Sequence, residues 1–189
     1  AEKHRAKRED VHALQYDQGD EKSIYGLRDQ VIEKSGTVDV LVNNSVARVT
    51  KKGWESEVDN FDKSMHINAT GLFLITRAFG EEMIKRNYGS IVNIGSIMGI
   101  VGLEQHNYDG TDMGSWSGDY FFHKGGMINF TLFCASYFGR YNIRVNCISP
   151  GGLRVPSQPE QFIKNYSERT QLGRLANDSD LKGAVLLMA

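Results

Sequence analysis

Short apolar runs of strand character alternate with helical patterns along this chain, and this alternation restricts the folds that it can adopt. The strand runs are Val11–Tyr16, Val38–Val42, Ser90–Ile94 and Ile143–Ile148, and the helical patterns are Lys22–Lys34, Val58–Arg86 and Tyr120–Arg140. Parallel strands joined by helices form a sheet with right-handed crossovers and helices on both faces. Near-continuous apolar strand cores are typical of strands buried in this way. The sequence therefore predicts an α/β fold with three layers around a doubly wound parallel sheet.

Polar or turn-forming residues follow each predicted strand at the point where it ends. They are Asp17, Asn43, Asn44, Ser96, Pro150 and Gly151. In an open parallel sheet the carboxyl ends of the strands meet at one edge, and ligands bind beyond that edge. Solvated loops without a function are the alternative explanation, but four such groups at one edge favour a site. We therefore expect a ligand-binding site there.

Tyr120 and Lys124 are four residues apart at the start of a predicted helix. Residues at this spacing share one helix face, so their side chains project into the same space. A nearby ammonium favours loss of a phenol proton, which suits a tyrosine to acid–base catalysis. An exposed pair on a helix surface would have the same spacing, and the motif alone leaves that alternative open.

The composition argues against several classes of function. With a net charge of −1 and scattered Lys and Arg residues, apart from stretch 3–8, the chain is a poor nucleic-acid binder. Cys134 and Cys147 are too few for a disulfide framework or a metal site, and we expect both to be buried thiols. No apolar stretch approaches the ~18 residues that a membrane span needs, and no signal peptide is visible. We predict a soluble, cytoplasmic protein that binds no metal.

Six short motifs occur in one order along the chain. They are Asn43-Asn44, Ile67-Asn68-Ala69-Thr70-Gly71, Asn93-Ile94-Gly95-Ser96, Tyr120-x-x-x-Lys124, Asn146-Cys147-Ile148-Ser149-Pro150-Gly151 and Leu172-Gly173-Arg174-Leu175. Each motif is common by itself, whereas the ordered set is specific. With this set the chain resembles the short-chain dehydrogenase/reductase family over essentially its whole length. The resemblance implies a Rossmann-type fold and an NAD(P)-dependent oxidoreductase that interconverts a secondary alcohol and a ketone.

The resemblance also implies the catalytic residues. Tyr120 would give or take the alcohol proton, and Lys124 would assist it and hydrogen-bond the nicotinamide ribose. Ser96 would donate to the substrate oxygen and stabilise charge that develops on it. Asn68 would hold a water in a proton relay that reaches Lys124, although a local helix kink would also explain this residue.

The cofactor implied by the resemblance is NAD or NADP, and NAD is favoured. Its contacts would be Asp17 and Gln18 at the adenine, Asn44 at the adenosine ribose, Leu153 at the nicotinamide, and Tyr120 with Lys124 at the nicotinamide ribose. The protein would orient this cofactor, which supplies or accepts the hydride.

The chain departs from the family pattern at its ends. No glycine-rich phosphate loop precedes Asp17. The run from Gly95 to Gly102 imitates the spacing of such a loop, but a polar segment follows it rather than a helix, so we interpret it as unrelated. We expect one Rossmann-like domain, residues 1–189, that lacks its first βαβ portion and its last strand. Residues 153–169 resemble the family's substrate lid.

The segment from Leu103 to Asp119 is longer than the family usually has between the serine and the tyrosine. Its many donors and acceptors suit a sugar or polyol, although an ordinary surface insertion explains the segment equally well. His106 in this segment is either a second acid/base or a solvated histidine. We expect His123 to face a neighbouring helix or solvent.

Aromatic residues on the outer side of the patterns 60–86 and 120–140 predict a homotetramer or homodimer, because related enzymes pair these helices between subunits. Two other functions stay open. One is a non-catalytic nucleotide-binding regulator with the same fold, against which the retained Ser96, Tyr120 and Lys124 argue. The other is a nucleotide-sugar epimerase or dehydratase that shares Tyr-x-x-x-Lys, against which Asn43-Asn44 argues.

Overall fold

We describe residues 11–50, 52–113 and 117–189 in a computed structural model of the chain. The helices are α2 (Glu21–Ser35), α3 (Val58–Met65), α4 (Gly71–Arg86), α5 (Gly118–Phe138), α6 (Glu160–Glu168) and α7 (Lys182–Met188). The strands are β1 (Val40–Asn43), β2 (Gly89–Ile94) and β3 (Ile143–Ile148). Short turns of other helix types are η1 (Gly53–Glu55), η2 (His66–Thr70), η3 (Ile97–Gly99), η4 (Gln105–Tyr108) and η5 (Gly139–Tyr141).

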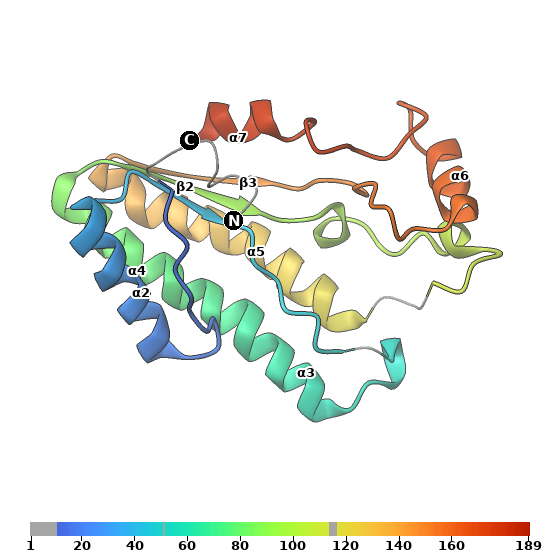
Figure 1. Ribbon diagram of the computed structural model, residues 1–189, viewed down its shortest axis with the longest axis horizontal. Coiled ribbons are helices and arrows are strands. Elements are labelled where there is room, and N and C mark those ends of the chain that lie inside the picture. Colours follow the sequence, from blue (N-terminus) through green and yellow to red (C-terminus); the bar gives the residue numbers. More distant parts are fainter. Residues whose placement is uncertain (1–10, 51, 114–116) are drawn as a thin grey trace.

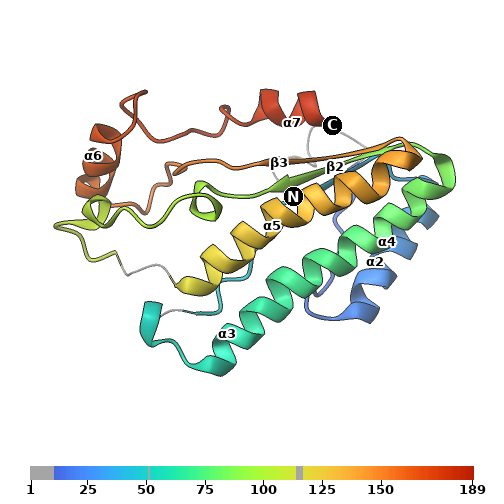
Figure 2. The same cartoon turned by 180° about the vertical axis from the view of Figure 1, so that it is seen from behind.

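The three strands form one parallel sheet in the order β1-β2-β3. The register aligns Asn43 with Asn93 and Asn93 with Cys147, so the strands end together at one edge. Helices α2, α4 and α5 lie on one side of the sheet, and α7 lies on the other side against β2 and β3 (Figures 1 and 2). The predicted α/β fold with a parallel sheet is confirmed.

Two apolar clusters hold the helices on the sheet. The first joins α4 and α5 to β2 and β3 through Met83, Ile91, Cys134, Phe138, Ile143 and Val145. The second joins α2 to α4 through Ile24, Leu74, Ile75, Ala78 and Phe79. Both cysteines are free thiols, as predicted; Cys134 is buried and Cys147 is only half-buried. Burial raises the pKa of Cys134 to about 12, so this thiol stays protonated inside the first cluster.

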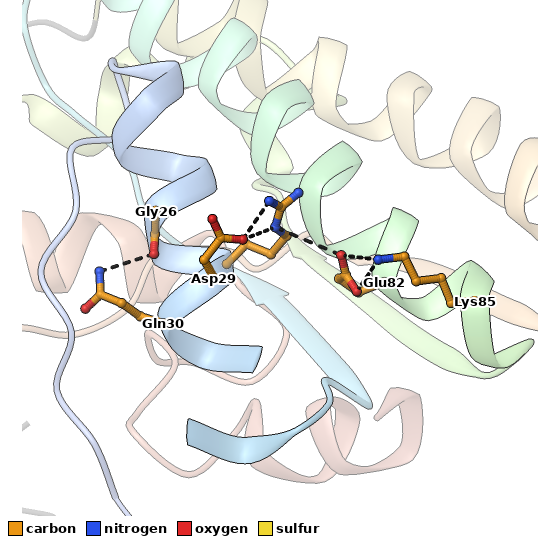
Figure 3. Close-up of polar contacts among 6 residues, drawn as sticks. Gly26, Asp29, Gln30, Glu82 and Lys85 are labelled. Carbon is orange, nitrogen blue, oxygen red and sulfur yellow. Dashed lines mark hydrogen bonds and ion pairs between the residues drawn. The ribbon is translucent and has the colours of Figure 1, made fainter. Parts of the chain in front are cut away.

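A row of ion pairs also links α2 to α4 (Figure 3). Arg28 Nη2 lies 2.6 Å from Asp29 Oδ1, and Arg28 Nε lies 4.0 Å from Glu82 Oε1. On α4, Lys85 Nζ lies 2.8 Å from the same Glu82 oxygen. Ion pairs near the surface contribute about 0–1 kcal/mol each, so the apolar cluster is the main link between the two helices.

Two predicted elements differ in the structure. Val11–Tyr16 is not a strand. A strand is defined by ladder hydrogen bonds to a neighbour, and the sheet of the described residues contains β1, β2 and β3 only. The predicted helix Val58–Arg86 is continuous, but a π-helical turn, η2, separates α3 from α4. The opening stretch 3–8, predicted as a helix face, lies outside the described residues.

Gly71 is the point of closest approach between α4 and the loop that contains Gln18. A Cβ built on Gly71 would lie 2.4 Å from the Gln18 carbonyl oxygen, while the Gly71 backbone has ordinary helical angles. We expect Gly71→Ala to lower the free energy of unfolding by about 1–3 kcal/mol, because the loop or the helix must shift. Gly26→Ala in α2 is the control: nothing lies within 4 Å of its added Cβ, so it should stabilise by up to about 1 kcal/mol. Chemical denaturation measures both, and equal effects would contradict the close approach.

Candidate functional site

A cleft of about 480 Å³ opens beyond the carboxyl ends of β2 and β3, and Ser96, Tyr120 and Leu153 all line it. Ser96 lies two residues after β2 and caps η3, since its Oγ accepts a 3.1 Å hydrogen bond from Met98 N. Tyr120 lies in the first turn of α5. The fold therefore brings the predicted serine and tyrosine to one cleft although they are 24 positions apart in the chain.

Lys124 lies one helical turn beyond Tyr120 and is 3% exposed. Its Nζ donates a 2.6 Å hydrogen bond to the Ile94 carbonyl oxygen and lies 5.8 Å from the centre of the Tyr120 ring. Burial lowers the pKa of Lys124 below its usual 10.5; Cys147 opposes this shift and Arg48 adds to it. An exposed helix pair, the simple alternative for Tyr-x-x-x-Lys, does not describe this lysine.

Asn68 is buried in the π-helical turn η2. Its Oδ1 accepts a 2.8 Å hydrogen bond from Ala47 N, and its Nδ2 donates to Ala47 O at 2.8 Å. Nδ2 also lies 3.1 Å from Ser64 Oγ. The wider turn of a π-helix reorients a side chain and is frequent at functional sites. Here the Asn68 side chain is hydrogen-bonded both to Ala47, in the chain that follows β1, and to Ser64 in the preceding helical turn.

Asp119 is a buried carboxylate beside Tyr120 that sequence reasoning missed as a site residue. Its oxygens accept hydrogen bonds from Thr50 Oγ1, at 2.6 Å, and from Ser64 Oγ. Burial opposes its ionisation, but hydrogen bonds from Ser64, Thr50 and Ser117 prevail, so its pKa is lowered from 3.8. Through Ser64 this carboxylate is connected to Asn68. An acid in a first helical turn indicates only a helix start, and these partners are 55 and 69 residues away in the chain.

A second, smaller hollow of about 30 Å³ lies beside the end of β1, and Gln18, Asn44 and Asn68 line it. Gln18 Nε2 donates to the Ile67 carbonyl oxygen at 3.0 Å, which fixes the amide at this edge. Asp17 does not line the hollow: its Oδ1 accepts a 2.8 Å hydrogen bond from Gly19 N within an exposed turn. Gln18 and Asn44 therefore line the same hollow, whereas Asp17 lies on a neighbouring turn outside it.

This edge of the sheet has donors and acceptors that suit part of a dinucleotide. Among the hydrogen bonds of the described residues, the Lys124 ammonium donates only to Ile94 O, so this buried cation has further N–H donors that could bind a hydroxyl. Gln18 and Asn44 bring two side-chain amides to the smaller hollow. The run from Gly95 to Gly102 forms η3 and irregular chain rather than a loop leading into a long helix, as expected for an unrelated segment.

The described part of the long segment before Tyr120 contributes to the wall of the cleft. Its Tyr108 lines the cleft, and the Tyr108 ring lies 5.4 Å from the Phe162 ring of α6. Asn165 Nδ2 on α6 donates to the Asp109 carbonyl oxygen at 2.9 Å. Tyr108 and Asp109 therefore pack against α6 beside the site. The alternative for this segment was a surface insertion without contacts to the site. That alternative disagrees with the position of Tyr108 in the cleft lining.

The two candidate histidines differ in environment. His106 is exposed and its Nδ1 lies 2.7 Å from Glu104 Oε1, outside the lining of the cleft, which fits a solvated histidine. His123 is buried, and its ring lies edge-on to the Tyr120 ring at 5.1 Å. Of the two predicted surroundings of His123, a neighbouring helix or solvent, its burial excludes solvent. The structure shows no hydrogen-bond partner of His123 Nε2 among the described residues.

Arg48 is a further cleft residue that sequence reasoning missed. It lies in the chain between β1 and α3 and lines the cleft, with its Cζ 5.4 Å from the centre of the Tyr120 ring. No signal in the sequence distinguishes it from other surface arginines. Its position depends on the hydrogen bonds that hold Ala47 to Asn68.

No group of three or more His, Cys, Asp or Glu side chains within 11–50, 52–113 and 117–189 is arranged to hold a metal ion. In the same part of the chain, no helix has the length and apolar character to cross a membrane.

The parallel sheet, with Ser96, Tyr120 and a buried Lys124 at its carboxyl edge, defines an α/β protein of the dinucleotide-dependent oxidoreductase type. A family profile described as enoyl-(acyl carrier protein) reductase matches residues 1–189. Cyclopentanol dehydrogenase from Comamonas testosteroni is 32% identical over 183 residues, which cover 94% of this chain and 69% of that protein. The chain belongs to the short-chain dehydrogenase/reductase family.

Solved structures agree with this assignment. A short-chain dehydrogenase from Leptospira borgpetersenii, solved with bound NAD+, has a TM-score of 0.83 and 32% identity, and the match covers 93% of this chain and 66% of that one. A xylitol dehydrogenase, also solved with NAD+, has a TM-score of 0.77 and 25% identity, covering 92% and 70%. The chain thus spans about two thirds of the length of these relatives.

Proposed function

We propose that this protein interconverts a secondary alcohol and a ketone with NAD or NADP as hydride carrier. The observation that supports the proposal most is the meeting of Ser96 and Tyr120 in one cleft, next to the buried ammonium of Lys124. A hydroxyl donor, a phenol and a cation are the groups that proton transfer to or from an alcohol oxygen needs. Solvent-exposed groups of the same types would be far less effective, because water screens their fields.

The roles follow from the geometry. Ser96 Oγ accepts from Met98 N, so its hydrogen points away from that bond and is suited to donate to a substrate oxygen. Tyr120 would exchange the proton of the alcohol, and Lys124 would favour its ionised form. Asn68, held through Ala47 and Ser64, would orient a water that leads toward Lys124. When bound, the dinucleotide supplies or accepts the hydride. Lys124 would hold its ribose, and Leu153 would lie against its nicotinamide.

We infer that NAD is favoured over NADP, and the two structural relatives described above, both solved with NAD+, support this preference. The substrate that we propose is a polyhydroxy compound of the sugar or polyol class. The names of the relatives, a cyclopentanol and a xylitol dehydrogenase, support secondary alcohols in general. The cleft lining also includes Tyr108 and Gln158, whose polar groups suit a substrate with several hydroxyls. Closure of 153–169 as a lid stays part of the proposal.

We also propose a homodimer or homotetramer in the cytoplasm. The outer side of α4 and α5 exposes the apolar side chains of Phe73, Leu132, Phe133 and Tyr137. An apolar surface of this kind on adjacent helices is typical of a subunit interface.

A turnover assay distinguishes this function from its alternatives. The full-length enzyme, given NAD+ or NADP+ and a panel of polyols, sugars, aldonates and simple secondary alcohols, should reduce the cofactor with at least one of them. Absorbance at the reduced nicotinamide band measures the rate. Tight cofactor binding without any turnover would favour the non-catalytic regulator instead. Conversion of a nucleotide sugar without net cofactor reduction would favour the epimerase or dehydratase.

A further inference from the structure

The described lining of the cleft carries positive charge only. Arg48 is the one charged side chain among the described residues that line it. The polar side chains among the other lining residues are neutral: Ser96, Tyr108, Tyr120, Ser157, Gln158 and Tyr166. A cleft whose described lining has one cation and no carboxylate attracts anions and disfavours cations.

The position of Arg48 relates this charge to the reacting atoms. Its Cζ lies 5.4 Å from the centre of the Tyr120 ring, so the guanidinium is next to the phenol that would exchange the alcohol proton. A group bound by Arg48 would therefore be a few bonds away from the carbon that carries the reacting hydroxyl. The segment that holds Arg48 is fixed, since Ala47 forms two hydrogen bonds with the buried Asn68 side chain.

We propose that Arg48 is a specificity-determining residue that binds a carboxylate of the substrate, and that the substrate is a polyhydroxy acid rather than a neutral polyol. This inference rests on the proposed function and names its substrate class. A guanidinium has five N–H donors in a planar fork that matches a carboxylate, and it can keep its ring contact at the same time. A phosphate would bring a second negative charge, for which the described lining has no second cation.

The test compares substrates that differ in this one group. D-gluconate and D-glucitol have the same number of carbons, and a carboxylate in the first replaces a hydroxymethyl group in the second. We expect the wild-type enzyme to have a higher kcat/KM for gluconate. In Arg48→Gln the ratio of kcat/KM for gluconate to that for glucitol should fall about 10- to 100-fold, the value of one hydrogen-bonded charge pair. Arg48→Lys, which keeps the charge without the fork, should give an intermediate ratio.

Arg140→Gln is the matched control. It removes the same charge at the far end of α5, where Arg140 lies over the Tyr137 and Tyr141 rings. Its substrate ratio should equal that of the wild type. A wild-type preference for glucitol, a preference for glucitol 6-phosphate, or a ratio unchanged by Arg48→Gln would each overturn the inference, while the proposed oxidoreductase activity would stand.

A binding measurement separates this inference from the proposed function. Gluconate should raise the thermal unfolding temperature of the wild-type enzyme with bound NAD+, and the rise should be lost in Arg48→Gln and kept in Arg140→Gln. If no alcohol is turned over but this protection is seen, the oxidoreductase function fails and the carboxylate site stands. If gluconate protects neither the wild type nor Arg140→Gln, the carboxylate site is refuted.

Discussion

Tyr120→Phe is expected to lower kcat at least about 100-fold while the dissociation constant of the cofactor stays within a few-fold of the wild-type value. The change removes the phenolic hydroxyl and nothing else, and general acid–base catalysis by a positioned group contributes about 10²- to 10⁴-fold. The ring itself stays, so its contacts with Arg48, at 5.4 Å, and with His123, at 5.1 Å, are retained. Steady-state kinetics and cofactor titration measure the two quantities.

Tyr88→Phe is the control for this variant. Tyr88 is half-exposed and lies just before β2, at the edge of the sheet opposite the site. Loss of its hydroxyl should leave kcat within a factor of about two, as for a surface substitution. Turnover by Tyr120→Phe at a rate near that of the wild type would show that another group exchanges the proton.

His123 is expected to make the protein less stable as the pH falls from 7.5 to 5. Burial, together with the Lys124 and Arg48 charges and against the Asp119 charge, lowers the pKa of His123 from 6.5 to about 4 in the folded chain. In the unfolded chain the same imidazole takes up a proton near pH 6.5, so the unfolded state binds more protons between these values and stability rises with pH. The stabilisation is fully present above pH 6.5 and is lost progressively toward pH 4.

The size of this effect follows from the shift. A difference from 6.5 to about 4 corresponds to about 3 kcal/mol in total, of which about 2 kcal/mol is lost at pH 5. His123→Gln cannot titrate, so its free energy of unfolding should fall about 2 kcal/mol less than that of the wild type over pH 7.5 to 5. Urea denaturation at several pH values measures both. His106→Gln, which changes an exposed histidine, should follow the wild-type curve, and parallel curves for the wild type and His123→Gln would contradict the prediction.

The strands near the site show which strand positions can be predicted from local sequence patterns. β3 begins and ends where its apolar run predicts, and β2 begins one residue earlier than predicted. These runs are short, apolar and bounded by turn residues, which suffices to identify buried strands. Val11–Tyr16 has a similar composition and forms no strand, because pairing with a neighbour is a property of the sheet and not of the segment.

In the helices, too, the sequence predicts some features and not others. The i to i+4 spacing of Tyr120 and Lys124 correctly predicts a shared face of α5. The π-helical turn around Asn68 has no counterpart in the apolar pattern, because a stripe of apolar residues defines a helix face but not the number of residues in one turn. The sequence left two surroundings open for His123 for a related reason: a single polar residue on a helix gives no indication of which neighbouring element will cover it.

What the sequence by itself determined is the order of strands and helices, the parallel sheet, and the presence of Ser96, Tyr120 and Lys124 at one edge. These follow from periodicity and from motifs, which are local properties of the chain. Only the tertiary structure decided that Arg48 stands beside Tyr120 in a cleft whose described lining holds no other charge. It alone also decided that Asp119 is bound by Thr50 and Ser64. Contacts of this kind join residues that are distant in sequence, and they form only when packing brings the separate elements together.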